Sequence, residues 1–253
     1  MSDCSIIPSQ LLAEHGIQAF FTTRKGGVSP PPYDSFNFAP DAEDDPEHIH
    51  TNLRRLVART GLLAPPHQAR QVHQCASIWC SGSGSLHNSE ADILLSSVAN
   101  TSVAVRTADC LPILLADPVA GIVAAVHAGW RGTAAGVVTA AIHEMVEHGG
   151  NTAHILASLG PCIGPCCFTI GEEAAIALAS SVDGAHHHIQ PHPLQADLVA
   201  INHLQLMASG ITEQHIEHCS QCTACNPEHF FSYRRDGHHS GRQLAVVAIP
   251  SAT

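Results

Sequence analysis

The stretch RTADCLPILLADPVAGIVAAVHAGWRG, residues 106–132, decides the fold. It contains two short apolar runs, Ile113–Ala116 and Ile122–Val126, each bordered by polar, glycine or proline residues. Runs of this length with such borders favour buried strands over helices. Two further runs, Ala91–Leu95 and Ser102–Arg106, precede them and have the same character. The centre of the chain is therefore predicted to be a set of buried strands.

Helices are predicted before and after these strands along the chain. From Pro46 the spacing of apolar residues predicts a helix that stops near Gly61. Two more helices are expected, each closed by a following glycine, over Thr133–His148 and Leu194–Ser209. A last strand is expected over Gln243–Ile249. Strands and helices are mixed without strict alternation, so the pattern predicts an α/β or α+β fold.

Composition limits the function classes. The chain has 253 residues, 45% of them hydrophobic and only 13% charged, which fits one globular domain over residues 1–253. The formal net charge of -11 argues against a nucleic-acid partner. No apolar run approaches the roughly eighteen residues of a membrane helix, and Met1–Gln10 lacks the pattern of a secretory signal. We expect a cytoplasmic protein with reduced cysteines and no membrane partner.

Two potential metal ligands follow predicted strands. Cys110 comes after Ser102–Arg106, His127 comes after Ile122–Val126, and His73 in RQVHQ is a third candidate. One thiolate and two imidazoles suit zinc, with copper as the alternative, and three protein ligands leave a fourth position open. The alternative is that Cys110 is a core thiol and both histidines are hydrogen-bonded core residues. Spacing alone does not decide between these interpretations.

Two arginines lie in glycine-containing loops that suit anion binding. Arg131 lies in AGWRG, ahead of a predicted helix, and Arg24 lies in TTRKGGVS. Helix starts and guanidinium groups both attract phosphate or carboxylate. The alternative is that both arginines are surface residues beside ordinary turns.

Other cysteine and histidine groups are not expected to bind metal functionally. The segment CSQCTAC resembles half of a zinc knuckle, but no partner follows at finger spacing. Its cysteines are Cys219, Cys222 and Cys225. A second group, predicted to be packed thiols, comprises Cys162, Cys166 and Cys167. The runs His186–His188 and His238–His239 are predicted to lie in solvated loops.

Taken together, the sequence resembles the laccase-domain family over about Phe20 to Ile249. The resemblance rests on these segments in order: TTRKGGVS, RQVHQ, ADILL, RTADCLPILLAD, VAAVHAGWRG, LGPCIGPCCFTIG and CTACNPEHFFSYRRDGHHSGRQ. Members were first called multicopper polyphenol oxidases and are now regarded as zinc-dependent purine nucleoside phosphorylases. The resemblance implies that His73, Cys110 and His127 are the metal ligands, in a compact four-layer arrangement of sheets and helices.

The resemblance also implies an activity. Its expected substrates are phosphate and the purine nucleosides adenosine, inosine, guanosine and methylthioadenosine, with adenosine deamination as a further reaction. Arg24, Asn37 and Arg131 are the expected substrate contacts; Asn37 lies in FNFAPDAEDD, which departs from the family's usual Asn-Leu-Gly run. Asp109 is either a proton shuttle or a residue that orients a ligand. We expect a monomer or a small homo-oligomer.

Three alternatives stay open from the sequence. A copper-dependent polyphenol oxidase would need several clustered histidine pairs, whereas the sequence indicates one triad. A cysteine hydrolase would use Cys110 as nucleophile and His127 as base. A role in cell-wall peptide quality control has been attached to similar bacterial proteins.

Overall fold

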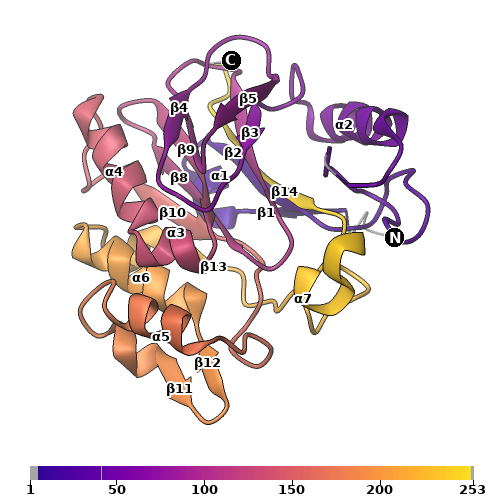
Figure 1. The fold of residues 1–253 in the computed structure, drawn as a ribbon. Helices are drawn as coiled ribbons and strands as arrows, with labels where there is room; N and C mark the ends of the chain where they lie inside the picture. Colours follow the sequence, from indigo (N-terminus) through magenta and orange to yellow (C-terminus); the bar gives the residue numbers. More distant parts are fainter. Residues whose placement is uncertain (1–4, 41, 252–253) are drawn as a thin grey trace.

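Two stacked sheets form the centre of the molecule, seen in the computed structural model of Figure 1, which describes residues 5–40 and 42–251. The first sheet contains β1 (Ile6–Pro8), β2 (Gln18–Thr22), β7 (Ser102–Thr107) and β14 (Gln243–Ala248) in the order β1-β2-β14-β7. The second contains β4 (Ser77–Trp79), β6 (Ile93–Ser96), β8 (Leu111–Asp117), β9 (Ile122–Ala128), β10 (Leu156–Leu159) and β13 (Ile216–His218). Its order is β13-β10-β8-β9-β6-β4.

Side-chain alternation along the strands explains why the sheets stack. In β7, Val103 and Val105 belong to the apolar cluster between the two sheets, whereas Ala104 belongs to a cluster on the opposite face. In β8, Leu114 faces the first sheet and Ile113 faces the helices. Successive residues of a strand point to opposite faces, so strands that are apolar at every position need cover on both sides.

Helices supply that cover. The helix α2 (Pro46–Thr60) packs on the outer face of the first sheet, and α4 (Val137–Glu147) and α6 (Leu198–Ala208) pack on the outer face of the second. Helix, sheet, sheet and helix form four layers in a single α/β domain, as predicted. None of the helices in the described part of the chain combines the length and apolar character needed to cross a membrane.

Smaller elements complete the described chain. The remaining helices are α1 (Gln10–Glu14), α3 (Trp130–Ala134), α5 (Glu172–Ala179) and α7 (Tyr233–Asp236). The 3-10 turns are Ala185–His188, Glu213–His215 and Gly237–His239. Two two-stranded sheets pair β3 (Gln68–Arg70) with β5 (Leu86–Glu90), and β11 (Ile189–Pro191) with β12 (Leu194–Ala196).

The predicted strands and the helix ending before Gly61 are confirmed, but two helix predictions are wrong in extent. The helix predicted over Thr133–His148 is two helices, because Gly136 adopts a left-handed backbone conformation, φ 78°, between α3 and α4. The helix predicted over Leu194–Ser209 begins only at Leu198. Asp197 is its N-cap, and the three residues of β12 come before it.

Candidate metal centre

The hairpin of β8 and β9 brings Cys110 and His127 together. Leu111 is paired with Ala128 and Pro112 with His127, so Cys110 lies directly before β8, beside the end of β9. His73 reaches the same point from the loop after β3. The three ligand atoms lie within 4.8 Å of one another, and Cys110 Sγ is 3.8 Å from His73 Nε2. The structure thus brings together the three residues that the sequence selected.

This arrangement fits a zinc ion. Tetrahedral zinc with bonds of about 2.3 Å to sulfur and 2.0–2.1 Å to nitrogen separates those atoms by about 3.6 Å. The separation of 3.8 Å between Cys110 Sγ and His73 Nε2 is close to that value. His127 is buried, whereas His73 is exposed and Cys110 is half-buried, so one side of the triad is open. A metal held here would keep one position for a ligand from outside.

A buried carboxylate, Asp92, orients two of the three candidate ligands. Its Oδ1 lies 2.7 Å from His127 Nδ1 and accepts the backbone N–H of His73 at 3.0 Å. The backbone N–H groups of Val72 and Gln74 donate to Oδ2. Because Nδ1 of His127 faces this carboxylate, Nε2 is directed to the metal position, as is usual for histidine ligands of metals. Asp92 was not among the predicted site residues.

Cys110 and His127 shift each other's pKa so that each favours its charged form. Burial by itself raises the pKa of Cys110, but the charge of His127 and hydrogen bonds to His127 and His73 lower it to about 6. Burial lowers the pKa of His127, but the Cys110 thiolate and the hydrogen bond to Asp92 raise it to about 9. At neutral pH the sulfur is therefore a thiolate, the form that binds metals.

The open side of the triad faces a cavity of about 730 Å³, within the range of small-molecule sites. The cavity has apolar and aromatic walls that include Leu86, Ile163, Phe168 and Tyr233. Four arginines also line it: Arg70, Arg106, Arg234 and Arg242. A flat apolar group and an anion can therefore be accommodated side by side next to the metal position.

Asp109 lies in the cavity wall beside Cys110, with a left-handed backbone conformation at φ 92°. One of its carboxylate oxygens accepts a hydrogen bond from Thr223 Oγ1 and the other from the backbone N–H of Arg234, both at 2.6 Å. These contacts hold a strained residue in place. They favour a role in orienting Cys110 over a role as proton shuttle.

The three expected substrate contacts lie elsewhere. None of them is among the described residues that line the cavity. Arg24 donates from Nε, Nη1 and Nη2 to Asp34 and to the carbonyl of Pro227. Arg131 is exposed, with its guanidinium 4.2 Å from the centre of the Trp130 ring. Asn37 is buried, and its Oδ1 accepts the backbone N–H of the cavity residue Arg242.

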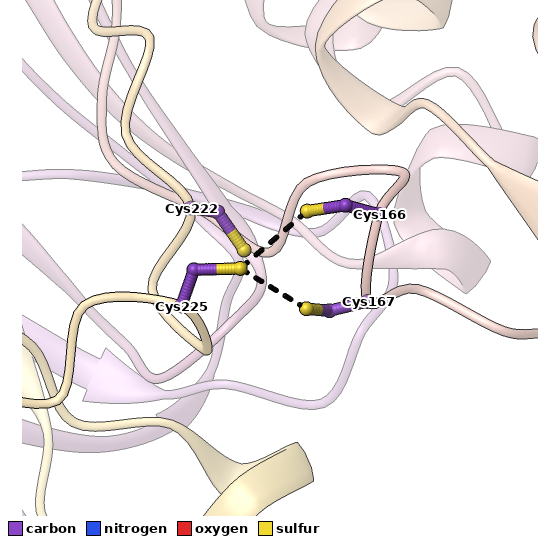
Figure 2. A group of neighbouring side chains, drawn as sticks. All are labelled: Cys166, Cys167, Cys222 and Cys225. Atoms are coloured by element: carbon purple, nitrogen blue, oxygen red, sulfur yellow. Dashed lines mark hydrogen bonds between the residues drawn. The ribbon is translucent and has the colours of Figure 1, made fainter.

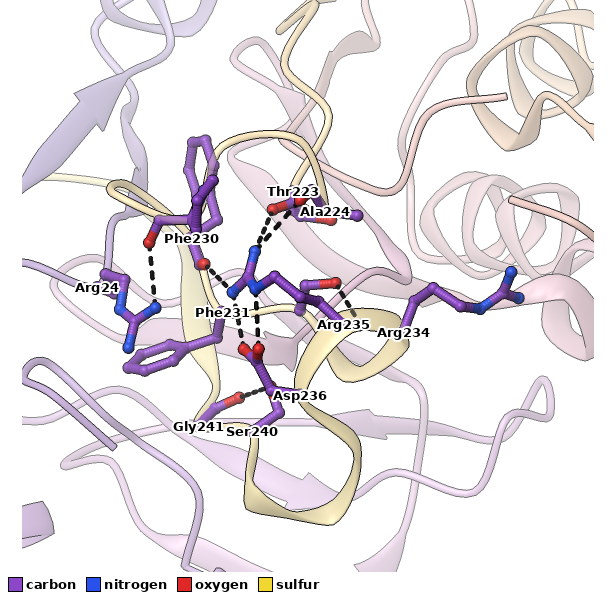
Figure 3. A network of polar contacts seen from close by, with 12 residues as sticks. Arg24, Thr223, Ala224, Phe230, Phe231, Arg234, Arg235, Asp236, Ser240 and Gly241 are labelled. Carbon is purple, nitrogen blue, oxygen red and sulfur yellow. Dashed lines mark hydrogen bonds and ion pairs between the residues drawn. The ribbon is translucent and has the colours of Figure 1, made fainter. Parts of the chain in front are cut away.

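A polar network around Arg235 fixes the segment that follows Thr223 (Figure 3). The Arg235 guanidinium makes two hydrogen bonds to Asp236 and donates to the carbonyls of Thr223, Ala224 and Phe230. The side chain of Arg234 points away from this network and lines the cavity. The network thus fixes the backbone from which a cavity arginine projects.

Comparison with known proteins identifies the family of this chain. Residues 18–250 match the family described as multi-copper polyphenol oxidoreductase laccase. The chain belongs to this laccase-domain family. An Escherichia coli relative, purine nucleoside phosphorylase YfiH, is 38% identical over 235 residues, which cover 92% of this chain and 93% of the relative.

A human relative and a solved bacterial structure are also similar to this chain. The human purine nucleoside phosphorylase LACC1 is 34% identical over 97% of this chain. The laccase-domain chain spans about three fifths of the length of the human and mouse relatives. The crystal structure of a Bacillus licheniformis hypothetical protein YfiH superposes with a TM-score of 0.89 at 26% identity, covering 98% of this chain and 97% of that one.

Two further groups of potential ligands are present in this laccase-domain structure. His67, Cys80 and His87 lie together, with His67 Nδ1 2.9 Å from His87 Nε2, and His87 lines the cavity. The second group consists of Cys166, Cys167, Cys222 and Cys225. The prediction that Cys166 is a packed thiol is wrong, because its side chain is exposed; Cys162 is buried as predicted. The sequence pattern predicted neither group as a metal site.

Gly129 provides the first test of the metal centre. A Cβ atom here would lie 2.8 Å from His73 Cδ2 and 3.0 Å from Cys110 Sγ, closer than normal contact. We expect Gly129→Ala to weaken zinc binding by about tenfold or more, the range seen when ligand positioning is disturbed. The zinc concerned is the one whose binding is lost in Cys110→Ala. Zinc affinity is measured by competition with a chromophoric chelator.

The matched control is Gly171→Ala, because a Cβ at Gly171 would meet no atom within 4 Å. Unchanged affinity in Gly129→Ala, with a circular dichroism spectrum like that of the parent, would contradict the geometry of the centre.

Proposed function

We propose that this chain is a zinc-dependent purine nucleoside phosphorylase that acts on adenosine, inosine, guanosine and methylthioadenosine, and that it also deaminates adenosine. The observation that carries the proposal is an open Cys/His2 triad on the wall of an arginine-lined cavity. The names of the E. coli and human relatives support the same reaction class. Bound zinc would supply a Lewis acid and lower the pKa of a water ligand.

The cavity residues suit the two halves of a nucleoside. In phosphorolysis, a phosphate oxygen forms a bond to the ribose C1′ while the bond from C1′ to the purine nitrogen breaks. The products are ribose 1-phosphate and the free base. Phe168 and Tyr233 offer rings against which a purine can stack, and the cavity arginines can hold the phosphate.

Arg242 is our candidate for the phosphate contact. Within the described part of the chain, its guanidinium donates hydrogen bonds from Nη1, to the carbonyls of Ser240 and Gly241. Arg234 donates from both Nη1 and Nη2 to the carbonyls of Cys167 and Thr169. Arg242 therefore has more donor capacity available for a ligand. We propose that Asn37 acts on the substrate indirectly, by fixing the backbone of Arg242.

Deamination requires a group that moves protons near the purine C6. Among the described residues lining the cavity, Asp109 is the single carboxylate, and it lies next to Cys110. We propose that it both orients this ligand and can exchange protons with the substrate. Its hydrogen bonds to Thr223 and Arg234 would favour the first role and slow the second.

The decisive assay incubates metal-replete protein with inosine and phosphate. We expect hypoxanthine and ribose 1-phosphate as products, with a loss of at least about 100-fold in kcat/KM in Cys110→Ala, because the metal's stabilisation of charge is removed. Cys219→Ala is the control, since this cysteine lies outside the three ligand groups. Undiminished turnover by Cys110→Ala would exclude the triad from the reaction.

Phosphate binding is tested by a pair of arginine variants. Loss of a charge-assisted hydrogen bond of about 1.5–3 kcal/mol should raise the KM for phosphate of Arg242→Ala by about tenfold or more. Arg131→Ala should change the KM for phosphate by less than about twofold. The opposite pattern would assign phosphate to Arg131, and a comparable loss in both variants would point to a site that the two share.

A cysteine nucleophile is the second candidate, because Cys110, His127 and Asp92 form a chain typical of cysteine hydrolases. Under our proposal, iodoacetamide alkylates Cys110 only in metal-free protein. The rate of Cys110 alkylation should rise as pH increases through about 6, where the thiol becomes a thiolate, and should fall below that pH. Alkylation that persists in saturating zinc would favour the nucleophile.

A copper-dependent phenol oxidase is the third candidate, favoured by the second Cys/His2 group, His67, Cys80 and His87. Copper sites for electron transfer use two histidines and one cysteine. Metal analysis of protein purified without a nickel column separates the candidates. Stoichiometric copper together with phenol turnover would support the oxidase, and zinc with inosine turnover would support the phosphorylase.

A further inference from the structure

Four cysteine sulfurs gather outside the described triad (Figure 2). Cys166 and Cys167 lie in the turn after β10, and Cys222 and Cys225 lie in the segment after β13. The parallel pairing of β10 with β13 explains why they meet, since both strands leave the sheet at the same edge. An isolated bridge between Cys162 and Cys222 continues the pairing into the two loops.

The spacing of the sulfurs fits a tetrahedral metal. All four lie within 4.8 Å of one another. Cys225 Sγ is 3.6 Å from Cys166 Sγ and 3.3 Å from Cys167 Sγ. Zinc–sulfur bonds of about 2.3 Å in a tetrahedron separate the sulfurs by about 3.8 Å. Figure 2 shows the four side chains converging from two loops on one point.

The surroundings of the cluster also suit thiolate ligands. The backbone N–H of Gly164 donates to Cys222 Sγ at 3.2 Å, which stabilises negative charge on the sulfur. A Cβ on Gly164 would approach Cys222 Cβ at 3.3 Å and Cys166 Sγ at 3.4 Å, so glycine permits the close approach. Cys166 and Cys225 are exposed, which argues against a role in core packing.

We propose that these four cysteines bind a structural zinc ion. Four thiolates close the coordination shell, and tetrahedral sulfur sites hold zinc or iron. The ion clamps two loops that carry cavity walls. Ile163 and Phe168 lie on the first loop, and Tyr233 and Arg234 follow the second. Arg234 also reaches across, donating to the carbonyl of Cys167 at 3.0 Å.

The proposal is tested in a Cys110→Ala background, which removes the triad's metal and makes the result independent of the proposed activity. X-ray absorption at the zinc edge should show a shell of sulfur at about 2.3 Å. Zinc content should then fall by one equivalent when Cys166 and Cys225 are both replaced by serine. The control is Cys219→Ser, which alters the same segment outside the cluster and should keep its zinc.

Several results would overturn the proposal. Equal zinc content in the double variant and in Cys219→Ser would do so, as would a zinc shell of nitrogen and oxygen alone. Stoichiometric iron would refute the choice of metal. Disulfides among these cysteines in protein isolated without oxygen, seen as a loss of two hydrogens per bond by mass spectrometry, would also refute it. The absorption measurement needs no change in the cluster, so it stands even if the double variant does not fold.

Discussion

The buried carboxylate of Asp92 is the constraint on which the rest of the site depends. It is fully buried and is compensated by three backbone N–H groups and by His127. A buried charge is tolerated only with such partners. One side chain therefore fixes the conformation of the loop that carries His73 and the orientation of the His127 ring. Both candidate ligands are therefore held by the same group.

The layered fold makes this arrangement rigid. Asp92 immediately precedes β6, which pairs with β9, the strand that carries His127. Cys110 immediately precedes the neighbouring β8, so Cys110 and His127 lie at adjacent strand ends in a sheet with a packed core on both faces. The cavity, by contrast, is built from loops. Its far wall depends on contacts between the segments after β10 and β13, where Arg234 donates to the carbonyl of Cys167. Asp109, ahead of β8, accepts hydrogen bonds from Thr223 and from the backbone N–H of Arg234.

Much of this could be predicted from the sequence, because local patterns encode it. Short apolar runs predicted the central strands, and a cysteine and a histidine at strand ends predicted two of the candidate ligands. Asp92 was missed because its role depends on a turn about twenty residues earlier, although an acidic residue at the start of a buried run was a usable signal. The break at Gly136 was missed because the surrounding alanines and valines continue a helical pattern.

The four-cysteine cluster shows where such prediction stops. Its two halves are separated by more than fifty residues and meet only through the pairing of β10 with β13. The cavity arginines were missed for a similar reason, since Arg234 and Arg242 follow no strand pattern that would mark them. Arg24 and Arg131 were predicted as anion contacts from their glycine-containing segments, yet the Arg24 guanidinium contacts Asp34 and the Arg131 guanidinium lies over the Trp130 ring.

Anomalous diffraction at the zinc edge, from crystals of the zinc-loaded protein, tests whether His73, Cys110 and His127 bind one metal ion. We expect a peak about 2.3 Å from Cys110 Sγ and about 2.0–2.1 Å from Nε2 of both histidines, with an open fourth position toward the cavity. Crystals with zinc bound elsewhere and no peak between these three side chains would contradict it.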